Sequence, residues 1–384
     1  MLKIRLIKGK FQADDQSTAD ILRNGYIGHN ESGKLLLSPE EALYLIDMRN
    51  AECTYSGKIL SFNEVASRFW KDRKFIAKYF TYKDWRERGL IINTAGEGAS
   101  KEANIPAKEY PSSSMSVPGY KVKGLFFKAD LITIIDDNKK GKDLYEKLWL
   151  GQYGAYKAAD RGQLNKLDIF ETAFLMDHKV LSLDNMKYKE LIKHATAARR
   201  DFPKLYEVYK DWREKGYVIK TGFKFGTHFR VYFPGASPVK EGKGQWIHSK
   251  HVIQVFPKDS KLLISEWARA IRVAHSVRKT FILAVPGSQD NKKVKLDYVL
   301  YHRENGIPEN PDTGTPKSAM LSLSEDEYIG GREFAGAIRE ARSRMLGLIV
   351  AIADRETSVT YYRVRQIKLP GSRHEYYEID WLQP

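Results

Sequence analysis

One stretch of this chain decides how the rest is interpreted. Its three parts are YKDWREKGYVIKTGFKFGTHFRVY (209–232), IHSKHVIQVF (247–256) and EWARAIRVAHSVRKTFILAV (266–285). Alternating apolar residues predict strands in the first two parts, and the third predicts an amphipathic helix that leads into a buried strand. Polar side chains stand at the ends of these elements. Tyr232 closes a strand, His248 opens the next, and Lys279 lies where the helix meets the buried strand.

Internal repeats extend outward from this stretch. YKDWREKGYVIKT (209–221) nearly duplicates YKDWRERGLIINT (82–94), and EWARAIRVAHSVRKTFILAV (266–285) matches EFAGAIREARSRMLGLIVAI (333–352). The helix-capping pair Ser38 and Glu41 returns as Asp168 and Glu171, each three residues apart, as a capping box requires. Repeats of this kind indicate copies of one structural unit.

The repeats divide the chain into three units of α+β type. A front half-copy (1–95) precedes a polar, Pro-bearing linker (96–118), a full unit (119–305, divided near 200), a second linker (306–317) and a rear half-copy (318–384). We expect residues 62–81 of the front copy to form one helix. The full unit carries a seven-residue insertion within QYGAYKAADRGQLNK (152–166) that the front copy lacks.

Composition favours a folded protein that binds a polyanion. The 384 residues suit two or three domains, 42% of them are hydrophobic, and the net charge is +16 with 22 Tyr and 17 Phe. Basic surface combined with aromatic side chains suits RNA, although a basic chain can also be merely soluble. The single Cys53 excludes an intramolecular disulfide, and the absence of a signal-like or membrane-spanning run leads us to expect a soluble, cytoplasmic protein.

Tyr232, His248 and Lys279 together could cleave RNA without a metal. Such a site needs a base for the 2′-hydroxyl, an acid for the leaving 5′-oxygen and a cation for the charge that builds on phosphorus. His titrates near neutrality and Lys is a point charge, whereas Tyr with a pKa near 10 is only about one part in a thousand ionised at pH 7. Cationic neighbours would have to reduce that deficit.

Each of the three also has an ordinary explanation. Singly, Tyr232 is more often a strand-end aromatic, His248 a turn donor and Lys279 a solvated cation at the end of a helix. The rear copy keeps the apolar and Arg framework but has Leu346 in place of Lys279, and we expect it to lack counterparts of the Tyr232 and His248 segments. A framework kept without its polar trio suggests a role beyond folding.

These segments closely resemble the catalytic subunit of archaeal tRNA-splicing endonucleases. The resemblance covers most of 119–303 and rests on GYVIKTGFKFGTHFRVY, HSKHVIQV and RAIRVAHSVRKTFILAV. It implies a catalytic unit with an N-terminal subdomain (119–200) and a mixed-sheet nuclease subdomain (201–305), flanked by degenerate units. The arrangement is most similar to the single-chain, three-unit (epsilon-type) form, which assembles as a homodimer.

The resemblance also implies roles for individual residues. Tyr232 would be the general base, His248 the general acid, and Lys279 would stabilise the pentavalent phosphate, with no metal and no cofactor. The substrate would be precursor tRNA cut at bulge-helix-bulge junctions, leaving 2′,3′-cyclic phosphate and 5′-hydroxyl ends. Arg272, and with less support Arg303, would clamp a bulged base by cation–π stacking.

Two further predictions concern loops. The insertion is expected to touch the RNA and widen the range of accepted bulges, with Lys157 as the contact, although a solvated loop explains it equally well. Within ADRETS (353–358), Asp354 and Glu356 are candidates for an acidic loop that docks into a partner's basic cleft, although a plain hairpin tip is the alternative.

Two other functions remain open on the sequence alone. The chain could be a non-catalytic RNA-binding or structural subunit that needs a separate catalytic chain, although the complete trio argues against this. It could also be a metal-dependent DNA nuclease, but its carboxylates at Asp290, Asp297 and Glu304 have no convincing ligand spacing.

Overall fold

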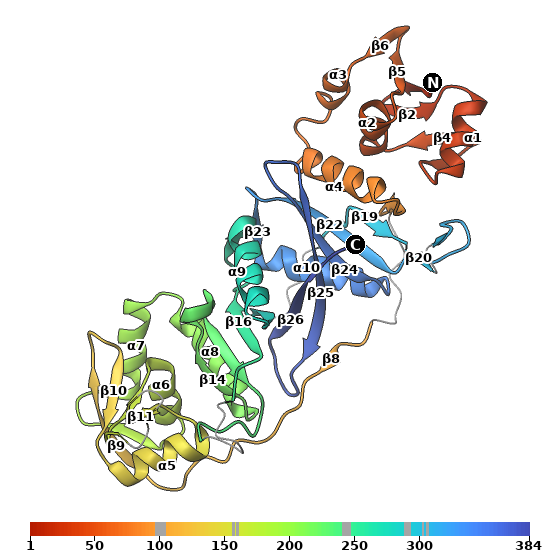
Figure 1. The fold of residues 1–384 in the computed structure, drawn as a ribbon. Coiled ribbons are helices and arrows are strands. Elements are labelled where there is room, and N and C mark those ends of the chain that lie inside the picture. The colour runs from red at the N-terminus through yellow and green to blue at the C-terminus, as the bar shows by residue number, and fades with distance from the viewer. Residues whose placement is uncertain are drawn as a thin grey trace.

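The computed structural model describes residues 1–96, 105–155, 158, 161–239, 247–287, 293–301, 303–304 and 307–384. It confirms an α+β protein with several mixed sheets (Figure 1). The front unit lies at one end, the N-terminal subdomain of the catalytic unit at the other, and a large sheet lies between them. None of the helices in the described ranges is long and apolar enough to cross a membrane.

The front unit is a six-stranded sheet with short helices. Strand order is β3-β4-β2-β1-β5-β6. Its strand β1 shows strict alternation of exposed and buried residues, as the sequence predicts. The elements are β1 (Lys3–Ile7), β2 (Lys10–Ala13), α1 (Gln16–Asn24), β3 (His29–Glu31), β4 (Lys34–Leu37), α2 (Pro39–Met48), β5 (Glu52–Tyr55), β6 (Lys58–Leu60) and α3 (Phe62–Ala66).

The N-terminal subdomain of the catalytic unit repeats this plan. Its five-stranded sheet has the order β11-β12-β10-β9-β13, and β9 pairs antiparallel with β10 and parallel with β13, as β1 does with β2 and β5. The elements are β9 (Val122–Phe127), β10 (Ile132–Ile135), α5 (Asn138–Leu148), β11 (Gln152–Tyr153), β12 (Asn165–Leu167), α6 (Ile169–Asp177), β13 (Leu181–Leu183) and α7 (Tyr188–Ala198).

Both predicted capping boxes are confirmed. Ser38 accepts from the Glu41 backbone N–H while the Glu41 carboxylate accepts from Ser38, and Asp168 and Glu171 repeat this exchange at the start of α6. The prediction of one helix over 62–81 is wrong. The helix stops at Ala66 and α4 (Phe75–Glu87) begins after a non-helical turn, because Phe69 folds back to stack on the ring of Phe75 with centroids 5.0 Å apart.

An eleven-stranded sheet joins all parts of the chain. Ten strands follow the order β14-β15-β16-β18-β26-β25-β24-β22-β19-β7, and β8 pairs with β25 beside this path. Its first half and the neighbouring elements are α8 (Phe202–Glu214), β14 (Val218–Thr221), the 3₁₀ turn η1 (Phe223–Phe225), β15 (Phe229–Tyr232), β16 (His251–Val255), β17 (Lys261–Leu263), α9 (Ile264–Ser276) and β18 (Thr280–Val285). The rest are β7 (Ile92–Thr94), β8 (Lys108–Glu109), β19 (Tyr298–Leu300), β20 (Arg303–Glu304), β21 (Ile307–Pro308), β22 (Ser318–Ser324), β23 (Tyr328–Gly330), α10 (Gly331–Ser343), β24 (Gly347–Ala353), β25 (Val359–Lys368) and β26 (Glu375–Leu382).

The two halves of this sheet are related by a pseudo-twofold axis at the pair Val364–Ile379. Phe281 pairs with Ile379 on one side, and Leu348 pairs with Val364 on the other. The side chains obey the same symmetry. The Tyr376 hydroxyl donates to Asp211 at 2.6 Å and the Tyr361 hydroxyl to Asp84 at 2.7 Å, and α8 and α4 carry these two carboxylates.

Three units in sequence therefore form two units in space. Strand β7 of the front copy and β19 (Tyr298–Leu300), near the end of the predicted full unit (119–305), complete the sheet of the rear copy. Residues 318–384 of the rear copy hold no counterpart of the Tyr232 segment themselves; β19, which precedes them in the chain, supplies it. Tyr301 follows β19 in the register that Tyr232 holds in β15, while Thr315 and Leu346 stand where the other half has His248 and Lys279.

Candidate active site

The register of three neighbouring strands brings the ends of β15, β16 and β18 together. Val231 pairs with His251, and His251 pairs with Thr280 on the far side. One row further along lie Tyr232, then Lys250, then Lys279, and the Thr280 N–H donates to the Lys250 carbonyl at 2.9 Å. The candidate acid lies just outside the sheet, two residues before Lys250.

Lys279 is fixed by backbone geometry and by its own ammonium group. Helix α9 ends at Ser276, and the Lys279 N–H reaches back to the Ala274 carbonyl at 2.9 Å, which closes the turn before β18. Its Nζ donates to the carbonyl and, at 2.9 Å, to the hydroxyl of Ser249. Since Ser249 follows His248, these bonds tie the candidate cation to the segment that carries the candidate acid.

Tyr232 and His248 line the same cavity. Its volume is about 510 Å³, and it lies between the N-terminal subdomain, which contributes Trp149 and Glu171, and the nuclease sheet. The Tyr232 side chain is buried, whereas His248 is exposed to solvent. Both residues also border a second cavity of about 290 Å³ on the side of Phe233. The phenol is thus enclosed by protein while the imidazole faces the open side.

Arg230 is a functional candidate that the sequence analysis missed. It lies two residues before Tyr232 on the same face of β15, and its guanidinium carbon is 5.8 Å from the centre of the Tyr232 ring. Burial lowers the pKa of the Lys279 ammonium, and the nearby charge of Arg230 lowers it further. The Arg230 Nε is buried and makes no hydrogen bond within the described part of the chain. A cation therefore stands beside both the candidate base and the candidate phosphate ligand.

The two predicted clamp residues belong to different halves of the large sheet within one chain. Arg272 is exposed on α9, one turn before the helix ends. Burial raises the pKa of Tyr362, and the nearby charge of Arg272 acts in the opposite direction. Arg303 begins β20, just beyond β19, and its side chain lies outside the described residues. Since β15 and β19 are seven strands apart in the sheet order, Arg303 is roughly 34 Å from the Tyr232 end.

The loop predictions meet different outcomes. Lys157 lies outside the described residues, but the stem of its insertion does not: Gln152 of β11 and Lys166 of β12 line the same cavity as Tyr232. At the tip between β24 and β25, the Asp354 carboxylate accepts from the N–H groups of Glu356 and Ser358 at 3.0 and 2.9 Å. Asp354 therefore shapes the turn, and Glu356 is exposed at its tip.

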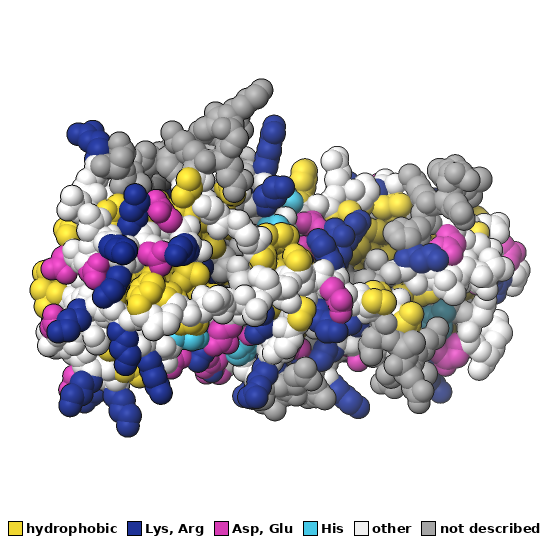
Figure 2. All heavy atoms as spheres, turned by 90° about the horizontal axis from the view of Figure 1, so that it is seen from below, with side chains coloured by type: hydrophobic (Ala, Val, Ile, Leu, Met, Phe, Trp, Pro, Cys, Tyr) yellow, Lys and Arg dark blue, Asp and Glu magenta, His cyan; other side chains and the backbone are white. Residues whose placement is uncertain are grey.

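The described residues contain no group of three or more His, Cys, Asp or Glu side chains placed to hold a metal ion. Of the carboxylates considered for a metal nuclease, Asp297 is half-buried against the rear half of the sheet, where it accepts from the Ser322 N–H at 2.7 Å. Asp290 and the side chain of Glu304 lie outside the described residues. On the face shown in Figure 2, Lys and Arg side chains project along the whole molecule, with Asp and Glu among them.

Two protein-family models match this chain. One describes the tRNA intron endonuclease N-terminal domain and covers residues 5–66, and the other describes the catalytic C-terminal domain of the same enzyme and covers residues 202–296. The second range contains Tyr232, Arg230, His248 and Lys279. Fold and site therefore define an endonuclease of the tRNA-intron class.

Curated relatives extend this match to most of the chain. A tRNA-splicing endonuclease of Methanococcoides burtonii is 28% identical over 346 residues, which cover 74% of this chain and 95% of the relative. One of Methanosarcina mazei is 27% identical over 76% of this chain and 96% of its own length. One of Methanopyrus kandleri is 37% identical over 151 residues, which are 38% of this chain and 79% of the relative. The chain belongs to the tRNA-splicing endonuclease family.

Proposed function

We propose that this endonuclease removes introns from precursor tRNA by metal-independent cleavage at bulge-helix-bulge junctions. The observation that carries the proposal is the row Tyr232–Lys250–Lys279 at one end of three strands, together with the cavity that Tyr232 and His248 both line. These are the residue types that a metal-free transesterification needs, and the names of the family models and relatives support intron-containing tRNA as the substrate.

In the proposed reaction, Tyr232 as phenolate takes the proton of the 2′-hydroxyl. The 2′-oxygen attacks the adjacent phosphorus, the bond between phosphorus and the 5′-oxygen breaks, and His248 in its charged form gives its proton to that oxygen. Lys279 stabilises the charge on the pentavalent phosphorane. The products are a 2′,3′-cyclic phosphate and a 5′-hydroxyl. Tyr232 then releases its proton to solvent, and His248 takes one up from solvent, which restores both groups.

Arg230 makes the tyrosine a more effective base. An ordinary phenol at pH 7 is short of its reactive form by roughly 4 kcal/mol. The Arg230 guanidinium, 5.8 Å from the ring centre, favours the phenolate by direct charge attraction. Lys279 keeps its ammonium oriented through the two Ser249 oxygens, so its charge is already in place when phosphorus becomes pentavalent.

Substrate binding and assembly complete the proposal. Two spatial units in one chain mean that a homodimer would present four, with two complete sites at Tyr232. In that dimer Arg303 of a second chain, rather than of the same chain, would join Arg272 in stacking on a bulged base. Glu356 would dock on the partner chain, and Lys157 would reach the RNA from the insertion whose stem borders the cavity. The three units of the sequence (1–95, 119–305 and 318–384) are part of the same proposal, with β19 of the second unit pairing in the sheet of the third.

The test is cleavage of an end-labelled, intron-containing precursor tRNA in the presence of EDTA, with the product ends mapped. Wild type should cut both junctions and leave cyclic phosphate ends, and His248→Ala should lose at least about a hundredfold in rate. Cleavage that requires added metal would refute metal independence. Cleavage that requires a second protein chain would move the assignment to a non-catalytic RNA-binding subunit.

A further inference from the structure

Trp149 combines an unusual backbone with an unusual neighbour. It ends helix α5 in the left-handed conformation, with φ 47° and ψ 46°. For a residue with a large side chain this conformation costs about 1–3 kcal/mol, so the surrounding structure must hold it. The Trp149 ring lies on the candidate base: its centroid is 4.6 Å from that of Tyr232, with the planes inclined by 40°.

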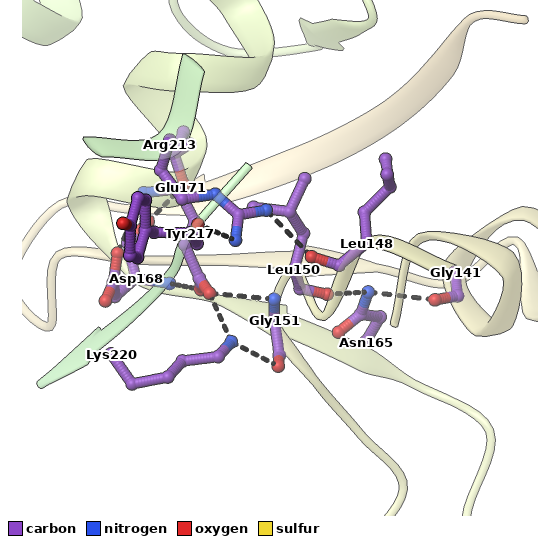
Figure 3. A network of polar contacts seen from close by, with 11 residues as sticks. Gly141, Leu148, Leu150, Gly151, Asn165, Asp168, Glu171, Arg213, Tyr217 and Lys220 are labelled. Carbon is purple, nitrogen blue, oxygen red and sulfur yellow. Dashed lines mark hydrogen bonds and ion pairs between the residues drawn. The ribbon is translucent and has the colours of Figure 1, made fainter. Parts of the chain in front are cut away.

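A buried network holds the backbone on both sides of Trp149 (Figure 3). The Leu148 carbonyl accepts from the Arg213 guanidinium at 2.7 Å, and the Leu150 carbonyl accepts from the Asn165 amide at 3.1 Å. Asn165 and Arg213 are almost completely buried. The turn is therefore fixed from α8, which belongs to the nuclease subdomain, as well as from β12.

Gly151 completes the clamp two residues after Trp149. Its N–H donates to Glu171 at 2.9 Å and its carbonyl accepts from Lys220 at 2.9 Å, while Lys220 and Glu171 are themselves paired at 2.5 Å. A Cβ added at Gly151 would clash with the Asn165 Oδ1, so no larger residue fits at this position. Strand β14, which carries Lys220, pairs with β15, which carries Tyr232.

The matching turn of the front unit shows which contacts belong to the repeated fold and which occur only beside Tyr232. It keeps the left-handed aromatic as Tyr26, with φ 54°, and it keeps the bonds from Gly28 to Glu41 at 3.0 Å and from Arg86 to the Gly25 carbonyl at 2.6 Å. The counterpart of Lys220 is Asn93. Within the described part of the chain, no aromatic ring stacks on Tyr26. The turn thus belongs to the repeat, and the stack belongs to the half that carries the trio.

We infer that Trp149 is a positioning residue for Tyr232: the clamped turn presses the indole against the phenol and holds its hydroxyl toward the scissile 2′-oxygen. The inference rests on the proposed role of Tyr232 as the base. It gives the N-terminal subdomain a direct part in the reaction, because the turn that bears Trp149 belongs to that subdomain. A base misplaced by about 1 Å can lose about a hundredfold in rate, so the stack has a measurable kinetic effect.

The experiment is a double-mutant cycle on the full chain, with single-turnover cleavage of precursor tRNA at saturating enzyme. Trp149→Leu should lower the rate about ten- to a hundredfold in wild type, with RNA affinity little changed, and Trp149→Phe should restore most of it. In the Tyr232→Phe background, Trp149→Leu should cause little further loss, because residues that act as one unit are not additive. An equal loss in both backgrounds would refute the inference.

Two controls separate a failure of this inference from a loss of stability and from a failure of the proposed base. Tyr26→Leu changes the matching turn of the front unit and should lower the melting temperature by a similar amount while cleavage stays unchanged. A comparable loss of cleavage in that variant would mean that the effect at Trp149 is one of stability, against the inference. A Tyr232→Phe chain that cleaves at the wild-type rate would instead refute the proposed base, whatever Trp149 does.

Discussion

Replacing Arg230 by Gln tests whether a cation activates Tyr232. The guanidinium carbon lies 5.8 Å from the phenol ring centre. Unit charges about 6 Å apart attract by about 3 kcal/mol at an effective dielectric of about 20, and by about 0.7 kcal/mol in bulk water. Because Arg230 is half-buried, its effect lies between these limits. Its loss should therefore raise the pKa of Tyr232 and lower the fraction of phenolate at pH 7 about 3- to 100-fold.

The assay is the single-turnover cleavage rate as a function of pH, from about pH 5.5 to about 10, with EDTA present. Because the Tyr232 phenolate and the charged His248 must be present together, a raised Tyr232 pKa should lower the rate about 3- to 100-fold across the plateau between the two pKa values, pH 7 included, and move the alkaline limb upward. The pKa of Lys279, which Arg230 lowers, should rise in the same variant and extend the alkaline limb. Arg230→Lys keeps a charge and should lose less.

A lower rate with an unshifted alkaline limb would refute this reasoning. It would mean that Arg230 binds the RNA rather than tuning the base. The corresponding signature would be weaker binding of an uncleavable precursor, with an unshifted pH profile.

Three further predictions follow from the geometry. Lys279→Met should lower the cleavage rate about 10²- to 10³-fold with nearly unchanged RNA affinity, since the ammonium that Ser249 orients acts on the transition state; a loss confined to affinity would contradict that role. Burial lowers the pKa of His251 to about 4, below its value in the unfolded chain. Because the unfolded chain binds the proton first, the free energy of unfolding should fall by up to about 3 kcal/mol as pH falls from about 6.5 to about 4. Denaturant unfolding of His251→Phe at both ends of that window should show a smaller loss than wild type, and an equal loss would contradict it. Glu356→Lys should weaken dimerisation in sedimentation, whereas Asp354→Asn, whose amide oxygen can still accept the turn's N–H bonds, should not; equal association constants would contradict the docking role.

Features encoded within a few residues were predictable from the sequence. The capping boxes at Ser38 and Asp168 depend on side chains three positions apart, so their geometry follows from local sequence and is confirmed. The fold class followed from repeats and periodicity. The break at Phe69 was missed because no Gly or Pro between residues 62 and 81 marks a helix end, and the stacking of Phe69 on Phe75 appears only in the structure.

Long-range contacts at the site were beyond sequence reasoning. Arg230 stands in a run that is already rich in basic residues, and only the strand register shows that it faces Tyr232. Trp149 precedes Tyr232 by more than eighty residues and reaches it through a left-handed turn that no pattern marks. Strand β19 has only three residues, too few for periodicity to reveal its place beside β7.

The shared sheet also dictates the order in which the protein can fold during synthesis. Strand β18, which follows Lys279, is covered on one side only by β26, about 90 residues later in the chain. At a synthesis rate of about 5–20 residues per second, that edge stays open for roughly 5–20 s. Strand β7 stays unpaired for roughly 10–40 s, until β19, about 200 residues later in the chain, has been made. Open strand edges pair readily with other chains. The large sheet can therefore close only late in synthesis, and the intervals before it does are when this chain is most exposed to misassociation.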